Sequence, residues 1–379
     1  MSSESGKRYD FIIAGGGLAG LVSSILLSRA GFSVLLAEKK TFPFHKVCGE
    51  YVSMEVAGFL KSLGFDPFVY GAARINRLRI STPDGKNIQV PLRMGGFGLS
   101  RYRFDSELCN LAMKQGVEVR QTCRVNDILF DGNFTVETSG GTFHSAFVIG
   151  SWGKRERLDK RLHRKFIEDR TGYLAVKYHV KSDHPEDEIG MDNFPGGYCG
   201  IVRIEEGKSN LCYLFRRNGN SYHNISDLEE RYLFKNPLLE KLFSRLTFLT
   251  KEPEVINEIS FTPRPCVEHH VLLCGDAAGL ITPICGNGMA MAIHGAKILS
   301  ELLIAHVTPG EGARMDRQLL EAEYARLWKK TFSQRLFWGR TLQSLTGNPL
   351  LTGSSLRMIH AIPSLERWMV GKTHGKELK

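Results

Sequence analysis

The feature that most constrains this chain is a glycine-rich turn between two short apolar runs near its beginning. Over residues 9–38, YDFIIA indicates a strand, GGGLAG a turn, LVSSILLSRA a helix and GFSVLLAE a second strand. This order is typical of a βαβ unit with a short crossover, and its turn matches the GxGxxG pattern. In that pattern Gly15 permits the tight turn, Gly17 lets the backbone approach a pyrophosphate, and Gly20 lets the helix pack on the strand.

The same unit predicts the chemical groups that the turn would bind. The helix begins directly after the glycines, so its first N–H groups and the positive end of its dipole would face phosphates. Glu38 ends the second strand, 18 residues after Gly20, and would accept hydrogen bonds from ribose hydroxyls. The sequence therefore predicts a dinucleotide site, which could hold either NAD or FAD.

A second motif, GDAAGLITPICGNGMAMA, favours FAD over NAD. Asp276 follows a short apolar run that indicates a buried strand, and its carboxylate would accept a hydrogen bond from a ribityl hydroxyl. Gly286, Asn287 and Gly288 begin a predicted helix whose N–H groups would face the flavin ring, where reduced flavin is negatively charged. Because FAD is long, a protein that retains it usually needs such a second contact region.

The rest of the chain predicts a separate sheet and a helical end. Residues 172–216 are alternating and aromatic, which indicates an antiparallel sheet, and residues 225–247 and the tail from 313 onward are predicted to be mostly helical. We therefore expect an α/β fold with an α+β insert, in which a Rossmann-like FAD-binding domain carries an antiparallel-sheet substrate domain. The expected ranges are 1–75, 98–165 and 253–306 for the FAD-binding domain, 76–97 and 166–252 for the substrate domain, and 307–379 for a C-terminal helical region.

Composition limits the partners and the kinds of site. The net charge of +10 permits binding to nucleic acid or to an anionic membrane, but no nucleic-acid-binding motif is present, so no such partner is expected. The eight cysteines lack the spacing of a metal site, so we expect no metal and a reduced, cytoplasmic protein. The basic C-terminal region mixes apolar residues, including Trp368, with Arg and Lys, so peripheral membrane contact is a further expectation.

Three stretches together resemble a known flavoprotein superfamily. GGGLAG with Glu38, SRYRFD at 100–105 and the GDAAG motif are similar to the FAD-dependent geranylgeranyl reductases and the hydroxybenzoate-hydroxylase-type monooxygenases, and they occur in the same order. The resemblance implies that Arg101 contacts the adenosine or pyrophosphate side of FAD.

The stretch HKVCGEYVS resembles the Cys-Gly element of the geranylgeranyl reductase branch. The resemblance implies that Cys48 and Gly49 lie beside the isoalloxazine ring of FAD and that Lys46 or Glu50 lines the active-site cavity. The alternative is a buried structural Cys48, because no base adjacent in sequence would make its thiol a thiolate.

Two departures from the family pattern bear on the reaction and the substrate. In VIGSWGKRERLD, Trp152 stands where many monooxygenases carry the acid of an Asp-Gly pair, which weakens the expectation of a monooxygenase-style encounter with NADPH. In GGYCGIVRI, Tyr198 is kept, but Cys199, Gly200 and Val202 remove the bulky aromatics of the prenyl reductase pattern GYxWxFP. A C20 prenyl substrate is therefore not assured, and smaller residues would admit a wider or more aromatic molecule.

These observations predict an FAD-dependent oxidoreductase that acts on a hydrophobic lipid, isoprenoid or polyketide-like molecule. Reduced FAD would transfer a hydride to a carbon–carbon double bond, with NAD(P)H as the electron donor and with Cys48, Glu50 and Tyr198 shaping the approach. One alternative is an aromatic monooxygenase that uses NAD(P)H and O2, and another is a non-catalytic flavin-binding protein. A flavin-dependent halogenase is disfavoured because no GWxWxIP-like stretch is present.

Overall fold

The predicted βαβ unit is the centre of the first of two large sheets. The computed structural model describes residues 6–217, 219, 221–310, 312–313, 316–345 and 375–378. Strands β1 (Arg8–Ala14) and β2 (Val34–Ala37) pair in parallel, and helix α1 (Leu18–Arg29) connects them. The sheet has the order β16-β17-β9-β1-β2-β6, with β7 and β8 joined beside β9. The other bounds are Glu118–Arg120 (β6), Val125–Asp131 (β7), Asn133–Thr138 (β8), Gly141–Gly150 (β9), Val267–Glu268 (β16) and Val271–Leu273 (β17).

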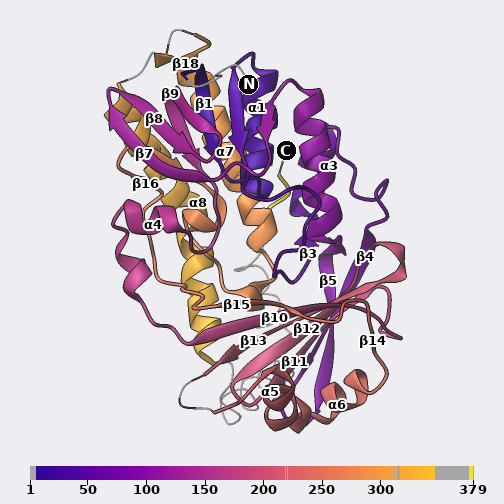
Figure 1. The fold of residues 1–379 in the computed structure, drawn as a ribbon. Coiled ribbons are helices and arrows are strands. Elements are labelled where there is room, and N and C mark those ends of the chain that lie inside the picture. Colours follow the sequence, from indigo (N-terminus) through magenta and orange to yellow (C-terminus); the bar gives the residue numbers. More distant parts are fainter. Residues whose placement is uncertain are drawn as a thin grey trace.

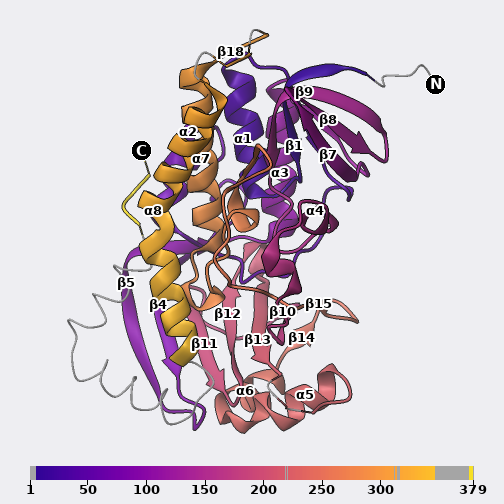
Figure 2. The same ribbon diagram turned by 90° about the vertical axis from the view of Figure 1, so that its left-hand side faces the viewer.

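Helices cover this sheet and form the main core with it. Helix α1 packs against α3 (Arg101–Lys114) and α7 (Gly288–His306), and α8 (Arg317–Leu345) runs beside α7 (Figures 1 and 2). Helix α7 is long and apolar enough to cross a membrane by length and composition. Its buried face nevertheless packs inside the fold, where Gly295 lies against the Trp328 ring, so α7 serves as a core helix here. Short helices α2 and α4 span Ala57–Ser62 and Arg157–Arg161, and the small strands β18 and β19 span Val307–Thr308 and Gly312–Ala313.

The second sheet is antiparallel except at one strand pair, and it lies across the end of the first sheet (Figure 1). Its order is β14-β10-β13-β12-β11-β4-β5-β3, with β15 also paired to β10. Helices α5 (Ile225–Arg231) and α6 (Pro237–Phe243) cover its outer face. The strand bounds are Tyr51–Ser53 (β3), Ala73–Ser81 (β4), Asn87–Gly98 (β5), Tyr173–Lys181 (β10), Glu188–Phe194 (β11), Gly197–Arg203 (β12), Ser209–Arg216 (β13), Thr247–Phe248 (β14) and Glu254–Asn257 (β15).

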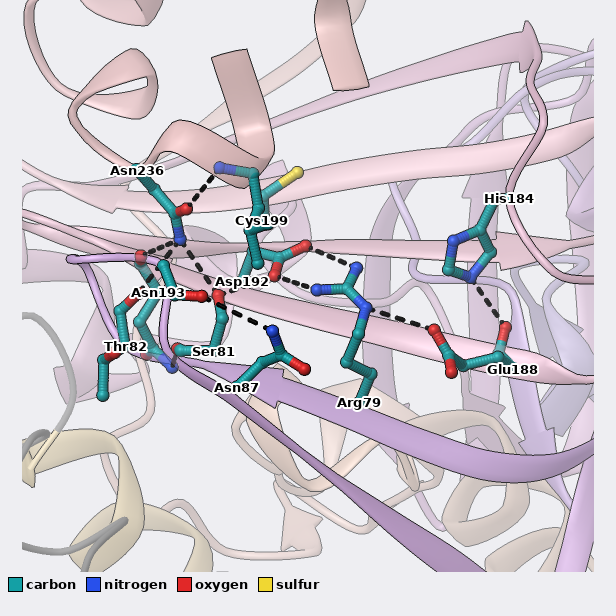
Figure 3. Close-up of polar contacts among 12 residues, drawn as sticks. Arg79, Ser81, Thr82, Asn87, His184, Glu188, Asp192, Asn193, Cys199 and Asn236 are labelled. Carbon is teal, nitrogen blue, oxygen red and sulfur yellow. Dashed lines mark hydrogen bonds and ion pairs between the residues drawn. The ribbon is translucent and has the colours of Figure 1, made fainter. Parts of the chain in front are cut away.

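Strands β4 and β11 form the parallel pair of the second sheet, and a buried polar network holds them together (Figure 3). The Arg79 guanidinium donates to both Asp192 carboxylate oxygens, at 2.5 and 2.9 Å, and to Glu188 at 3.1 Å. Asn236, which caps α6, donates to Ser81 Oγ at 3.0 Å. Because these buried charges are paired and hydrogen-bonded, the network fastens β4, β11 and α6 to one another on the face that carries the helices.

The local predictions agree with these elements, whereas the sheet assignment differs at several strands. The strand–turn–helix–strand unit over 9–38 is confirmed. The helical stretch predicted over 225–247 is two helices, because Asn236 turns inward as a cap and Pro237 starts a new helix. Strand β3, the start of β4, and β15 lie in ranges expected to belong to the FAD-binding domain, yet they pair in the second sheet. The amphipathic tail around Trp368 lies outside the described residues.

Candidate FAD and substrate site

The glycine turn at the end of β1 leaves a helix start open to an anion. Gly15 has a φ of +106°, and a Cβ there would lie 2.7 Å from the Ser151 carbonyl oxygen. A Cβ on Gly20 would overlap the Gly15 carbonyl oxygen, so both positions need glycine. Gly17 is the N-cap of α1 and no side chain caps this helix, which leaves its first N–H groups for phosphate oxygens.

Two cations lie beside this helix start. The Arg101 guanidinium is bound to Asp105 by two hydrogen bonds of 2.7 Å, and Lys46 Nζ lies 2.9 Å from the same carboxylate. A Cβ on Gly17 would be only 3.7 Å from Arg101 Nη2 and 3.9 Å from Lys46 Nζ. Burial acts to raise the pKa of Asp105, but Arg101 and Lys46 outweigh it and hold that pKa below its ordinary value. The cluster fits a pyrophosphate held between α1 and these two side chains.

Glu38 lies at the same turn. Its carboxylate is buried and accepts from the backbone N–H of Gly16 at 2.8 Å and of Lys40 at 3.0 Å. The carboxylate therefore sits where β2 ends beside the phosphate-binding turn, as a ribose contact requires.

The second predicted flavin-binding stretch meets the first at a close helix–helix contact. A Cβ on Gly275 would lie 3.0 Å from Ala19 in α1 and 3.6 Å from Ala292 in α7, so the starts of both helices are adjacent. Asp276 follows Gly275, is partly exposed, and is close enough to Arg101 and Arg264 to influence the pKa of each.

The start of α7 is shaped by glycine. Gly286 has a φ of +61°, and Gly288 begins α7 after the N-cap residue Asn287, whose side chain makes no capping bond to the helix. The Gly275 contact thus brings the Asp276 segment next to α1, and a carboxylate beside a helix start without a side-chain cap is compatible with the ribityl chain and ring end of FAD.

The segment 45–50 lies between the two sheets and is held by its backbone. The carbonyl oxygens of residues 46, 47 and 48 accept, in order, from Lys177 Nζ at 3.1 Å, Lys154 Nζ at 3.1 Å and Asn210 Nδ2 at 3.0 Å. These donors come from β10, from the loop after β9 and from β13. Cys48 is partly exposed, and Gly49 is exposed with open space where a Cβ would be.

Glu50 ends this segment in a left-handed conformation, with a φ of +55°, and its side chain is fully buried. Its carboxylate accepts from Lys177 Nζ at 2.5 Å and from the Arg101 backbone N–H at 2.8 Å, and it pairs with His179 Nε2 at 2.7 Å. Burial acts to raise the pKa of Glu50, but Lys177 and His179 outweigh it and hold the pKa at about 2. Glu50 therefore acts through its partners rather than by lining open space.

Sequence reasoning missed Lys177, His179, Lys154 and Asn210. A signal was present in β10, YLAVKYHVK, where Lys177 and His179 share the inward parity of an otherwise apolar strand. Their common partner, Glu50, lies more than 120 positions away, so no local pattern could identify it.

Away from Lys177 and His179, the inward face of the second sheet is mostly apolar and partly exposed. Tyr198 packs there with its hydroxyl buried and without a hydrogen-bond partner among the described residues. Gly200 and Cys212 are neighbours on this face and are partly exposed, and a Cβ on Gly200 would meet nothing closer than 3.6 Å. Cys48 is near enough to influence the pKa of Cys212.

Only one of the three small replacements opens this face. Cys199 packs with the helices on the outer face, and Val202 packs beside Tyr51 and Ile75. Of the three, Gly200 is the one that leaves room for a side chain on the inward face.

The loop after β9 is tied to the Asp276 region through a buried ion pair. Trp152 Nε1 donates to Asp159 at 3.1 Å, and Arg164 Nη1 pairs with the same carboxylate at 2.8 Å. Arg164 also donates to the Ala277 carbonyl at 2.9 Å. Trp152 stands at the position where the Asp-Gly pattern has its acid. The carboxylate of this loop comes instead from Asp159, seven residues further along the chain.

Comparison with known proteins bears on the kind of protein that carries this site. No family model matches the chain. A digeranylgeranylglycerophospholipid reductase of Methanosarcina acetivorans is 26% identical over 340 residues, which cover 85% of this chain and 81% of that protein. Digeranylgeranylglycerophospholipid reductase 2 of Methanothermobacter thermautotrophicus is 26% identical over 346 residues, which cover 87% of this chain and 85% of that protein.

Solved structures show the same fold. A geranylgeranyl bacteriochlorophyll reductase-like protein of Thermoplasma acidophilum has a TM-score of 0.73 at 20% identity, covering 89% of this chain and 87% of that one. A triple mutant of the flavin-dependent brominase Bmp2 has a TM-score of 0.75 at 20% identity, covering 96% and 94%. The chain is an FAD-dependent oxidoreductase of the flavoprotein superfamily to which the geranylgeranyl reductases belong.

Proposed function

We propose that this enzyme reduces carbon–carbon double bonds of an isoprenoid lipid. The observation that carries the proposal is the position of segment 45–50, which is held between the sheets so that Cys48 lies near Cys212 on the inward face. The relatives named as digeranylgeranylglycerophospholipid reductases, which match more than four-fifths of the chain, support this substrate class.

The inward face suits a hydrophobic molecule. Tyr198 packs there in a cluster of apolar side chains that come from the second sheet and from the loops before α7. Its buried hydroxyl has no partner among the described residues, so a polar atom of a ligand would remove the cost of leaving it unpaired. The cluster also contains Val47, Tyr173, Ala175, Met191, Leu214, Ile256, Ile259, Phe261, Leu280 and Ile284.

The protein's own residues would bind and orient the reactants. Reduced FAD, when bound, supplies the hydride, and we propose NAD(P)H as the donor that reduces it. The α1 start, Arg101 and Lys46 would hold the pyrophosphate, and Glu38 the ribose. Asp276 and the start of α7 would hold the ribityl chain and the ring end, while Cys48 and Tyr198 shape the approach of the double bond.

A single-turnover experiment tests this function. FAD-loaded protein is reduced anaerobically and mixed with digeranylgeranylglycerophospholipid, and flavin absorbance and lipid mass are followed. We expect reoxidation of the flavin without O2 and a gain of two hydrogen atoms for each double bond reduced. A Cys48→Ala variant should be slower, whereas Cys123→Ala, which changes a buried cysteine near the first sheet, should match the unaltered protein. Flavin that stays reduced for as long as O2 is absent would contradict the proposal.

A second candidate function is aromatic monooxygenation with NAD(P)H and O2. The observation that favours it is Gly200, which leaves space for a flat, wide substrate where a bulky side chain would exclude one. The same protein mixed with O2 and an aromatic acceptor would then yield a hydroxylated product.

We also propose that the basic C-terminal region contacts the membrane that presents a lipid substrate. The segment around Trp368 lies outside the described residues.

A further inference from the structure

A buried row of charged and polar side chains crosses the interface between the sheets. Glu50 Oε1 accepts from Lys177 Nζ at 2.5 Å, and Glu50 Oε2 pairs with His179 Nε2 at 2.7 Å. All three side chains are at most 8% exposed. Apolar side chains of similar volume would avoid the desolvation of these charges, so packing alone does not explain the row.

We propose that this row is a proton relay for the reduction, with Lys177 as the proton donor and with Glu50, His179 and His45 returning a proton to it from solvent. The inference rests on the proposed function, because a hydride added to one carbon of a double bond requires a proton at the other.

The outer end of the row reaches the surface of the protein. His45 is partly exposed, and its ring stacks on Tyr102 with 4.7 Å between the ring centroids. Tyr102 is 40% exposed. The His45 ring also meets the His179 ring edge-to-face at 5.0 Å. These contacts place one imidazole at the solvent side and the other at the Glu50 carboxylate.

The inner end lies on the substrate-facing side of the sheet. Lys177 is directly opposite Cys212 in the β10–β13 pairing, and the Cys212 side chain is partly exposed. An ammonium group has three N–H bonds. Among the described residues, two of those on Lys177 go to Glu50 and to the Lys46 carbonyl, and the third would serve an atom of the substrate.

The charges around the row suit proton transfer. Burial acts to raise the pKa of Glu50, but its partners hold it at about 2, so the carboxylate stays ionised between two proton-binding groups. Burial lowers the pKa of His45, and the positive charges of Lys177 and His179 lower it further, so neutral His45 can accept a proton from solvent. Other charged, titratable and polar groups that lie around the row or contact its members are Lys46, Arg101, Tyr102, Asp105, Asn210, Cys212 and Glu254.

The step balances in protons and electrons. One carbon of the double bond receives the hydride, whose electron pair comes from reduced FAD, and the other carbon takes a proton from the Lys177 ammonium. A C–H bond forms, an N–H bond breaks, and Lys177 is left as a neutral amine. A proton then moves from His179 to Glu50 and from Glu50 to Lys177, and His179 regains its proton from solvent through His45.

The first test needs no turnover. In oxidised, FAD-loaded protein, the histidine rings are titrated by NMR between pH 5 and pH 10, with His179 and His45 assigned by single substitution. We expect the pKa of His45, which burial and the charges of Lys177 and His179 already lower, to fall further in Glu50→Gln, because the variant removes a negative charge that acts to raise it. A His45 ring that titrates identically in the unaltered protein and in Glu50→Gln would overturn the relay whatever the substrate is.

The second test uses single turnover with reduced FAD and digeranylgeranylglycerophospholipid. His179→Gln should slow flavin reoxidation by about 10²-fold or more and remove its pH dependence, whereas FAD affinity stays within twofold. The matched control is His184→Gln, which changes another buried histidine of the same domain that is remote from Glu50 and hydrogen-bonds the Glu188 carbonyl. A His179→Gln variant that keeps the rate and pH profile would also overturn the relay.

The two proposals fail in different ways. If the unaltered protein does not reduce the lipid, the proposed function fails, and the NMR titration alone decides whether the row exchanges protons. If the lipid is reduced but Lys177→Met keeps the full rate with FAD bound normally, the function stands and Lys177 is not the donor.

Discussion

Lys177, in the second sheet, reaches the carboxylate of Glu50, at the end of the segment that joins the two sheets, with an N–O distance of 2.5 Å and almost no exposure of either side chain. This contact spans 127 positions of sequence and lies against the site proposed for FAD and substrate. This buried ion pair therefore fastens the segment to the second sheet beside the proposed site.

Removing one member of this pair should destabilise the protein strongly. Lys177→Met leaves the buried Glu50 carboxylate with fewer partners, and the loss of one partner of a buried ion pair typically costs about 3–5 kcal/mol. Urea unfolding followed by far-UV circular dichroism measures the change in the free energy of unfolding. The double variant Lys177→Met/Glu50→Gln should recover part of the loss, and a single variant with an unchanged urea midpoint would contradict this expectation.

Lowering the pH should reduce the contribution of the same ion pair to the free energy of unfolding. Folding lowers the pKa of Glu50 from 4.5 to about 2, so its contribution to stability is complete above pH 4.5 and is lost as pH falls from 4.5 towards 2. The loss corresponds to a free energy on the order of 3 kcal/mol. Unfolding free energies measured at several pH values should fall less steeply across this window for Glu50→Gln than for the unaltered protein. Parallel curves would show that other carboxylates dominate.

FAD affinity should depend on Arg101 but not on Arg103, which lies on the same helix. Arg101→Met removes a guanidinium beside the α1 start, and the loss of a charged hydrogen bond to phosphate predicts a Kd for FAD raised by about tenfold to a hundredfold, or roughly 1.5–3 kcal/mol. Quenching of flavin fluorescence on titration measures the Kd. The control is Arg103→Met on the same helix, because Arg103 pairs at the surface with Glu206. Equal effects of the two variants would place the phosphates elsewhere.

The affinity of the enzyme for a bulky substrate should depend on Gly200. Gly200→Leu fills the open space on the inward face without a close backbone contact, so KM for the isoprenoid lipid should rise at least about tenfold while FAD binding is unchanged. Steady-state kinetics and FAD titration separate the two effects. Cys199→Ala, on the same strand but facing the helices, should leave KM as it was. A Gly200→Leu variant with normal KM would move the substrate away from this face.

Short-range patterns predicted much of the fold and the local parts of the candidate site. The βαβ unit, its glycine turn and Glu38 lie within one local segment, so strand, turn and helix chemistry predict them directly. Strand pairing and side-chain contacts between residues far apart in the sequence have no such local signal. β3 follows the Cys-Gly element by only a few residues, yet it joins the second sheet by pairing with β5. Lys177 and His179 likewise become part of the site only because β10 passes beneath segment 45–50.

Three consecutive carbonyl oxygens fasten that segment, and peptide carbonyls are the same whatever side chains the residues carry. Val47 and Cys48 can therefore be exchanged for other residues while the three donors continue to hold the chain in place, whereas the Lys46 side chain also pairs with Asp105. A change of side chain at position 47 or 48 leaves these three hydrogen bonds in place. Because the backbone carbonyls carry the support, the side chains at these two positions can vary with little effect on the position of the segment.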